Sequence, residues 1–235
     1  MTGAEHIQPK LRKKLSIGKK VLLSFLTLIL ALVALAAVAY SRYIHPTGKI
    51  MPGLYAIKAG GNGSPMVNFF LLKIGEEYIA IDAGAVNDQT QRELHKLGIS
   101  ASDIVAVFIT HSDQDHIGSI DLFNSATIYT GNTENSQFPD IPHQIMSDGE
   151  IIELSGMSIL CIYTPGHTVD SVCYLINGKY LFVGDLLFNP NFARHDRELQ
   201  ILHREKMMGI ESVEYVFTGH FGLFKDARFF RWWWR

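Results

Sequence analysis

Basic residues are scarce in the body of this sequence and gather at its two ends. The 235-residue chain has 21 Lys/Arg and 23 Asp/Glu; residues 1–20 hold six basic and one acidic residue, and residues 225–235 hold four and one. The remaining 11 basic and 21 acidic residues give residues 21–224 a net charge of −10. A surface that binds nucleic acid needs concentrated basic side chains, so this balance argues against a polyanionic substrate and against nucleic acid as a partner.

Charge is absent altogether from residues 21–40. As a helix, this run would extend about 30 Å, which is enough to cross the hydrocarbon core of a bilayer. Basic residues lie mostly before the run, so the positive-inside rule places residues 1–20 in the cytoplasm and the rest of the chain outside. We therefore predict a single-pass signal anchor.

A cleaved signal peptide is the competing interpretation of residues 1–39, because Ala37-Val38-Ala39 resembles a small-residue cleavage site. The apolar run is longer than the usual core of a signal peptide, and the basic region before it is also long. Both features favour a retained anchor. Either interpretation puts the following domain on the extracytoplasmic side of the membrane.

Cysteine is rare as well, with only Cys161 and Cys173 on two neighbouring apolar runs. Outside the cytoplasm the pair could form one disulfide bond if their Cα atoms lay within bonding range. Both positions also suit a buried thiol, and this is the interpretation we favour.

Residues 110–118, with the sequence Thr-His-Ser-Asp-Gln-Asp-His-Ile-Gly, follow an apolar run at 104–109 that is typical of a buried strand. This segment brings together His111, Asp113, Asp115 and His116. Imidazole and carboxylate groups both offer lone pairs to a divalent cation, and a loop that leaves a strand can bring them to one point. A metal site is the favoured interpretation; a plain polar turn is the alternative.

Three later strand-like runs end on further candidate ligands. Residues 157–163 lead to His167, residues 180–183 lead to Asp185, and residues 213–217 lead to His220. A glycine directly precedes each of these three residues and permits a sharp turn at the end of the strand. Four strands that each end on a possible ligand favour a shared metal centre.

The order of these residues resembles the motif of the metallo-β-lactamase superfamily, His-x-His-x-Asp-His followed by a His, a bridging Asp and a last His. The resemblance covers roughly residues 50–222 and includes two opening strands at 67–72 and 79–84. It implies an α/β fold, a four-layer αββα sandwich, here preceded by one transmembrane helix.

The resemblance also implies roles for the individual residues. A first metal ion would be held by His111, Asp113 and His167, a second by Asp115, His116 and His220, and Asp185 would bridge them. Two zinc ions are expected, with a metal-bound hydroxide as nucleophile and Asp115 as the catalytic residue that orients it or carries its proton. The matching Asp of the family supports the site from behind, and here this is Asp82.

Asp113 departs from the family pattern, which usually has His at this position. A carboxylate is a harder ligand than imidazole, so manganese or iron becomes an alternative to zinc. Some branches of the family carry Asp there, including exported nucleases of the DNA-uptake type, so the departure does not imply inactivity.

The expected function is that of a membrane-anchored, outward-facing hydrolase. Its substrate would be a small molecule or a lipid or envelope component with an ester, lactone, thioester, amide or phosphodiester bond. The alternative is a non-catalytic or redox member of the same fold, although the sequence contains no flavin domain. The oligomeric state is left open.

Four segments outside the motif need separate interpretation. The glycine-rich turn at 60–65 is either a lid over the metals or a plain hairpin loop, and the loop at 130–142 could shape substrate choice. We expect a first strand at 54–57, a helix at 87–97 and another at 117–124. A further helix should open at Arg194 and run to about residue 208; Arg194, His195 and His203 either contact substrate or, as we favour, form a solvated face.

The C-terminal residues combine Lys225, Arg228, Arg231 and Arg235 on one side of a potential helix with most of the aromatic residues on the other. This pattern predicts contact with a lipid surface, and an unstructured or packed end is equally compatible. We divide the chain into a cytoplasmic basic tail (1–20), a transmembrane helix (21–40), a linker (41–49), a metallo-β-lactamase-like domain (50–224) and a basic aromatic tail (225–235).

Overall fold

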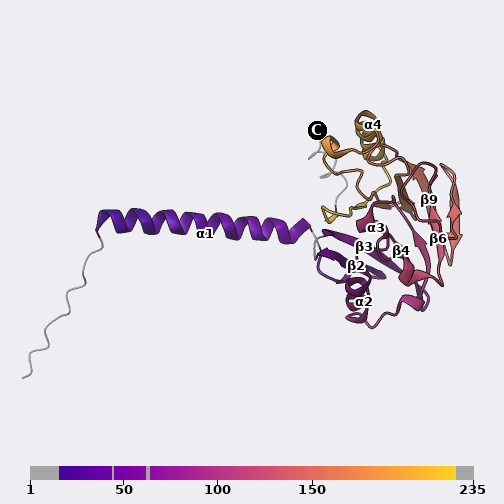
Figure 1. Ribbon diagram of the computed structural model, residues 1–235, viewed down its shortest axis with the longest axis horizontal. Coiled ribbons are helices and arrows are strands. Elements are labelled where there is room, and N and C mark those ends of the chain that lie inside the picture. Colours follow the sequence, from indigo (N-terminus) through magenta and orange to yellow (C-terminus); the bar gives the residue numbers. More distant parts are fainter. Residues whose placement is uncertain (1–15, 44, 62–63, 226–235) are drawn as a thin grey trace, which may run out of the picture. The chain divides into compact units, whose positions relative to one another are not determined.

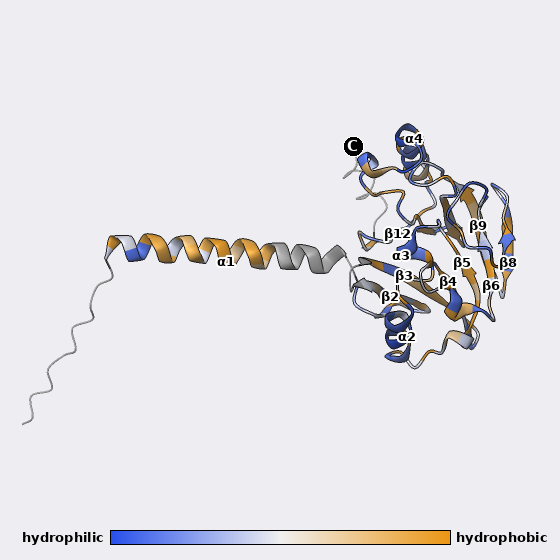
Figure 2. Ribbon diagram, viewed as in Figure 1, coloured by the Kyte–Doolittle hydropathy of each residue, from blue (hydrophilic) through white to orange (hydrophobic). Residues whose placement is uncertain are grey.

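The computed structural model describes residues 16–43, 45–61 and 64–225 and divides the chain into two units, 1–40 and 41–235. Helix α1 (Ile17–Tyr43) includes the stretch Ile17–Leu35, which is long and apolar enough to cross a membrane. Figure 2 shows that the coloured part of α1 is predominantly apolar beyond its first turn. A single helix of this kind is weak support for a membrane span, and the predicted lipid-binding tail lies, from residue 226 on, outside the described residues.

The second unit contains a seven-stranded sheet whose strands follow one another in chain order. They are β1 (Gly48–Met51), β2 (Leu54–Gly61), β3 (Ser64–Ile74), β4 (Glu77–Ile81), β5 (Ile104–Phe108), β6 (Thr127–Thr130) and β7 (Gln144–Ile145). The strands from β1 to β4 pair antiparallel, and those from β4 to β7 pair parallel.

A six-stranded sheet lies in the order β13-β12-β11-β10-β9-β8. Its strands are β8 (Ile151–Leu154), β9 (Met157–Tyr163), β10 (Val172–Ile176), β11 (Tyr180–Phe182), β12 (Tyr215–Phe217) and β13 (Leu223–Phe224). All neighbours pair antiparallel except β11 and β12, which pair parallel.

Three apolar cores separate four layers. Residues such as Phe70, Phe108 and Tyr174 fill the space between the sheets. A second core packs the other face of the first sheet against helix α2 (Asn87–His95), helix α3 (Gln114–Ile117) and the 3₁₀ helix Ile120–Phe123. A third core packs the second sheet against helix α4 (Arg197–Met208). In Figure 1, α2 and α4 lie on opposite outer sides of the two sheets, so the predicted αββα sandwich is confirmed.

Several local predictions need correction. The first strand is β1, which precedes the expected segment 54–57. The helix expected at 117–124 is divided between α3, which begins at Gln114, and a separate 3₁₀ helix, because Ser119 between them leaves the helical conformation. Helix α4 starts at Arg197 rather than Arg194, since the Asp196 side chain caps it by accepting from the N–H groups of Glu198 and Leu199.

The two cysteines are free and buried, and they belong to the cores on opposite faces of the second sheet. Side chains that point to opposite faces cannot be joined by a disulfide. Burial raises the pKa of both thiols to about 12, so they remain neutral at physiological pH. The prediction of buried thiols is thereby confirmed.

Candidate metal centre

All seven residues predicted to hold metal lie in one cluster at the ends of β5, β9, β11 and β12. They form three overlapping groups in which the ligand atoms lie within 4.8 Å of one another. The groups are His111, Asp113 and His167; His111, His116 and Asp185; and Asp115, His116 and His220. Four strands that are distant in the sequence therefore deliver their side chains to one place.

Asp185 lies between the two sets of predicted ligands. Its Oδ2 atom is 3.6 Å from Nε2 of His167 and 3.3 Å from Nε2 of His220, and its Oδ1 atom is 3.3 Å from Nε2 of His116. In the first set, Oδ2 of Asp113 lies 3.1 Å from Nε2 of His167. In the second set, Oδ2 of Asp115 lies 3.0 Å from Nε2 of His220. The carboxylate of Asp185 is therefore within 3.6 Å of ligand atoms from both sets.

Three of the four imidazole rings are held through Nδ1, which leaves Nε2 facing the cluster. Nδ1 of His220 lies 2.7 Å from the carbonyl oxygen of Met66, and Nδ1 of His116 lies 2.8 Å from Oδ2 of Asp82. A carbonyl or carboxylate oxygen can only accept a hydrogen bond, so Nδ1 must carry the proton in both rings. The neutral form of each ring then has its lone pair on Nε2, as a metal ligand needs.

Asp82 supports this arrangement from behind, as the resemblance implied. It accepts hydrogen bonds from the backbone N–H and the hydroxyl of Thr110, and the same hydroxyl oxygen lies 3.0 Å from Nδ1 of His111. Asp82 has a φ of 67°, a left-handed conformation that is uncommon outside glycine. Strain of this kind persists where the surrounding structure fixes it, often at functional sites.

Two glycines allow the ligands to approach one another. A Cβ atom on Gly219 would lie 2.7 Å from Cε1 of His116 and 3.0 Å from Oδ1 of Asp185. A Cβ on Gly184 would lie 2.5 Å from Oγ1 of Thr110, and Gly184 has a φ of 49°. The glycines that precede Asp185 and His220 are therefore needed for space and, in one case, for backbone conformation.

The donor set fits a divalent cation. Among the described residues, Nε2 of His111, Nε2 of His116 and Oδ1 of Asp185 are buried side-chain atoms that make no hydrogen bond, although the latter two lie 3.3 Å apart as an ion pair. Leaving buried polar atoms without hydrogen bonds is costly. Nitrogen and oxygen ligands that converge on such a point are the chemistry that zinc and similar transition metals require.

Electrostatic coupling within the cluster is strong. Burial alone lowers the pKa of His220, but Asp185 and Asp115 outweigh burial and raise it to about 10. Burial raises the pKa of Asp185, but His116 and His220 outweigh burial and hold the pKa well below its usual range. Carboxylates and protonated imidazoles stabilise one another here, so a metal ion must displace protons when it binds.

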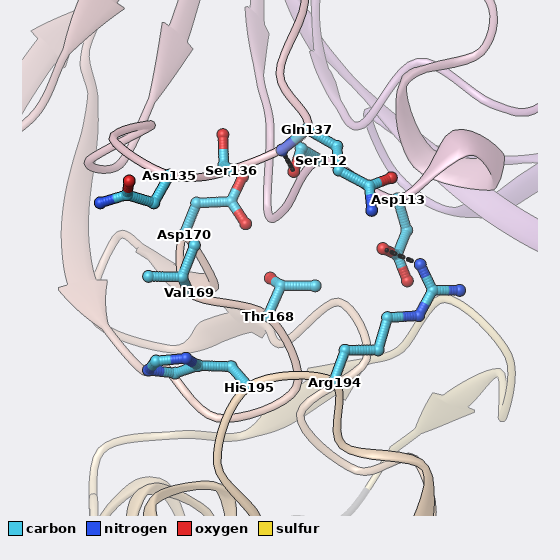
Figure 3. Close-up of a pocket in the computed structure, with 10 residues that line it drawn as sticks. All are labelled: Ser112, Asp113, Asn135, Ser136, Gln137, Thr168, Val169, Asp170, Arg194 and His195. Atoms are coloured by element: carbon cyan, nitrogen blue, oxygen red, sulfur yellow. Dashed lines mark hydrogen bonds and ion pairs between the residues drawn. The ribbon is translucent and has the colours of Figure 1, made fainter.

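A polar cavity of about 160 Å³ adjoins Asp113 and is lined by Ser112, Asn135, Gln137, Thr168, Arg194 and His195, among others (Figure 3). The loop expected to shape substrate choice forms part of this wall, because the backbone N–H of Gln137 donates to Oγ of Ser112 at 3.1 Å. His203 was also considered as a possible substrate contact, together with Arg194 and His195. It does not line the cavity, and its Nδ1 lies 2.9 Å from the carbonyl oxygen of Pro165.

An aromatic group lies against two imidazole rings of the cluster and was not anticipated from the sequence. The ring centroid of Phe188 lies 6.1 Å from that of His167 and 5.6 Å from that of His220, and Phe188 also contacts Phe192 and Phe221. Phe192 is 62% exposed. The only available signal was position, since these residues follow Asp185 and His220 closely.

The sequence predicts that Arg194 contacts substrate or forms part of a solvated face, and the structure shows its side chain 59% exposed and lining the cavity. Its Nη1 atom donates to Oδ1 of Asp113 at 2.8 Å, although the two residues are 81 positions apart (Figure 3). The carboxylate in place of the family's usual His could have suggested a compensating cation, but no sequence pattern indicated which one.

Comparison with known proteins identifies the superfamily. A sequence model of the metallo-β-lactamase superfamily matches residues 63–220. The chain belongs to this superfamily. Enzymes with the metallo-β-lactamase fold bind metal ions, typically zinc.

Individual relatives agree with this assignment. The chain is 31% identical over 122 residues to a hydroxyacylglutathione hydrolase of Glaesserella parasuis, a match that covers 49% of this chain and 50% of that protein. It is 29% identical over 164 residues to an atrochrysone carboxyl ACP thioesterase of Aspergillus fumigatus, covering 63% and 52%. The match thus spans about half the length of these curated relatives.

A solved structure of a metallo-β-lactamase family protein from Thermus thermophilus has the same fold. Its TM-score is 0.63 at 18% identity, and the match covers 77% of each chain.

Proposed function

We propose that this protein is a metal-dependent hydrolase. The observation that carries the proposal is the position of Asp185 between two sets of ligand atoms, together with imidazoles whose Nε2 lone pairs face the cluster. His111, Asp113 and His167 would hold one ion, and Asp115, His116 and His220 a second, with two zinc ions as the expected metals. When bound, such ions acidify a water molecule and polarise the bond to be cleaved.

Asp115 is the proposed catalytic residue. Its Oδ2 lies 3.0 Å from Nε2 of His220, and its side chain is 13% exposed, so it is the one among the three carboxylates with the greatest access to solvent. Its carboxylate is therefore placed to orient the attacking water and to accept a proton from it. Burial raises the pKa of Asp115, but His220 and His116 outweigh burial and lower it, so the carboxylate is ionised and can accept a hydrogen bond from the attacking water.

An ester or thioester is the favoured substrate class. The names of the relatives above, an ACP thioesterase and a hydroxyacylglutathione hydrolase, support carbonyl substrates, and the net charge of −10 over residues 21–224 disfavours nucleic acid. Phe188, Phe192 and Phe221 could pack on an apolar part of the substrate while the cavity beside Asp113 takes a polar part.

A signal anchor is the proposed localisation. Helix α1 would hold the domain on the extracytoplasmic side, because the basic residues of 1–20 precede the apolar run. The substrate would then be a small molecule or a lipid or envelope component at that surface.

The function is tested by loading the purified protein with zinc or manganese and screening chromogenic esters, thioesters, lactones, β-lactams, amides and bis-nitrophenyl phosphate. We expect hydrolysis of a carbonyl substrate. At equal bound metal, it should be at least about 100-fold slower in Asp115→Asn, because a general base contributes about 10²–10⁴-fold. The matched control is His143→Asn, since His143 directly follows the 130–142 loop and its Nδ1 lies 2.8 Å from the carbonyl oxygen of Ile141 rather than in the cluster. Metal binding without activity on any compound would favour a non-catalytic role.

A further inference from the structure

Arg194 contacts the one predicted ligand that departs from the family pattern. Its Nη1 atom donates to Oδ1 of Asp113 at 2.8 Å (Figure 3). The other carboxylate oxygen, Oδ2, lies 3.1 Å from Nε2 of His167 and 3.6 Å from Nε2 of His111. The two oxygens of Asp113 therefore have different neighbours, a guanidinium on one side and two predicted metal ligands on the other.

This contact differs from an incidental surface ion pair. The Asp113 side chain is only 7% exposed, so its carboxylate is largely removed from competing water. The backbone of Arg194 is fixed as well, because its N–H donates to the carbonyl oxygen of His167 at 2.7 Å. Arg194 is thus tied through its main chain to one predicted ligand and through its side chain to another.

The next two residues reinforce this attachment. The N–H groups of His195 and Asp196 donate to the carbonyl oxygen of Gly166 at 3.3 and 2.9 Å, and the Asp196 side chain caps helix α4. The segment 194–196 is consequently held between the loop that carries His167 and the start of α4. The backbone position of Arg194 is therefore fixed by the fold, while its side chain is 59% exposed and reaches Asp113 through Nη1.

We propose that Arg194 is a positioning residue that sets the metal selectivity of the first site. Arg194 donates a hydrogen bond to Oδ1 and so leaves Asp113 one oxygen for a metal ion. Its positive charge also offsets the negative charge of the carboxylate. The pair then resembles a neutral imidazole, which offers a single donor atom and is the residue the family usually has here. This inference rests on the proposed metal centre and concerns which ion it prefers.

Removal of the guanidinium should change the kind of ligand that Asp113 provides. A carboxylate with both oxygens free can bind an ion through two atoms, and anionic oxygen ligands suit manganese better than a nitrogen-rich site does. The loss of a positive charge also strengthens the binding of any cation, but it acts equally on Zn²⁺ and Mn²⁺. The ratio of their dissociation constants therefore isolates the effect on coordination.

The experiment is a double-mutant cycle on the full-length protein. The wild type, Arg194→Gln, Asp113→His and the double variant are compared by chelator competition for Zn²⁺ and Mn²⁺, with the electron paramagnetic resonance of Mn²⁺ as an independent measure of binding. We expect Arg194→Gln to shift the ratio toward Mn²⁺ by about tenfold, the size typical of changes next to a metal ligand. In the Asp113→His background the same substitution should leave the ratio unchanged.

Arg197→Gln is the matched control, because this nearby exposed arginine pairs with Glu198 instead. It should leave the ratio at the wild-type value. If Asp113→His does not fold, Asp113→Asn serves as the background, since an amide has one oxygen whether Arg194 is present or absent.

An unchanged ratio in Arg194→Gln would overturn the proposal, as would an equal shift in both backgrounds. An increase in KM with an unchanged metal ratio would instead assign Arg194 to substrate binding and also overturn it. A wild-type protein that binds neither ion would refute the metal centre itself, so failure of the proposed function is distinguishable from failure of this inference.

Discussion

His116 and Asp82 are joined by a contact of 2.8 Å between Nδ1 and Oδ2 beneath the proposed metal centre. The other oxygen of Asp82, Oδ1, accepts from the backbone N–H of Thr110, also at 2.8 Å. The carboxylate thus fixes the proton of His116 on Nδ1 and at the same time holds the loop that carries the first ligands. Both effects require a side chain that accepts hydrogen bonds through both of its terminal atoms, as the two oxygens of a carboxylate do.

Asp82→Asn should reverse the tautomer of His116. The amide oxygen would remain on the N–H of Thr110, so the amide NH₂ would face Nδ1 and move the imidazole proton to Nε2. Because this removes the lone pair, we expect zinc affinity to fall about 10–100-fold. Chelator competition measures the affinity, and Asp121→Asn, an exposed acid on the 3₁₀ helix Ile120–Phe123, is the control. Equal affinity in both variants would contradict the role of Asp82.

Gly219→Ala should disturb the centre sterically. The added methyl would lie 2.7 Å from Cε1 of His116, so the ring or the loop must shift, at an expected cost of about 1–3 kcal/mol in the free energy of unfolding and a loss of bound zinc. The control is Gly209→Ala at the end of α4, where the added methyl would come no closer than 3.4 Å to the carbonyl oxygen of Lys206. Urea unfolding and metal analysis should separate the two variants.

The metal-free protein should lose stability as the pH rises above neutrality. The pKa of His220 is raised from 6.5 to about 10 in the folded state, so its stabilising effect is fully present below pH 6.5 and is lost toward pH 10. We expect the free energy of unfolding in the presence of a chelator to fall by on the order of 3 kcal/mol between pH 6.5 and 9.5. Urea titrations at these two pH values measure the change.

Zinc affinity should change in the opposite direction over the same range. Metal binding requires the neutral imidazole, so each protonated ring must release its proton, and affinity should rise with pH. A metal-free protein whose stability did not fall with pH, or a zinc affinity independent of pH, would contradict the coupling between His220 and the carboxylates.

Membrane attachment should depend on residues 1–40. The unit 41–235 contains all three cores and all seven predicted ligands, so we expect it to fold without residues 1–40. We expect a variant without residues 1–40 to appear in the soluble fraction with its zinc affinity unchanged. The full chain should resist carbonate extraction, and its domain should be open to protease from the extracytoplasmic side. Release of the full chain by carbonate would contradict the anchor.

The fold and the cluster could be predicted because each ligand directly follows an apolar strand in a recognisable order. The apolar runs before His111, His167, Asp185 and His220 indicated a shared centre, and the resemblance to the superfamily motif supplied the full set of ligands. Helix boundaries were less accurate, because the true start of α4 depends on a cap by Asp196 and not on periodicity.

Contacts between distant segments were beyond what the sequence indicated. The pair formed by Arg194 and Asp113 and the aromatic contact of Phe188 with His220 arise from the path of the segment between Asp185 and α4. That path is set by backbone hydrogen bonds from residues 194–196 to the loop at Gly166 and His167, which no local pattern encodes.

The most direct test of the metal centre is the zinc content of the purified full-length protein, measured by elemental mass spectrometry after exhaustive dialysis with zinc and desalting. Two equivalents of zinc per chain are predicted for the wild type. His116→Asn should lose zinc, and His143→Asn should retain the wild-type zinc content. Wild-type protein that retains no transition metal would contradict the account.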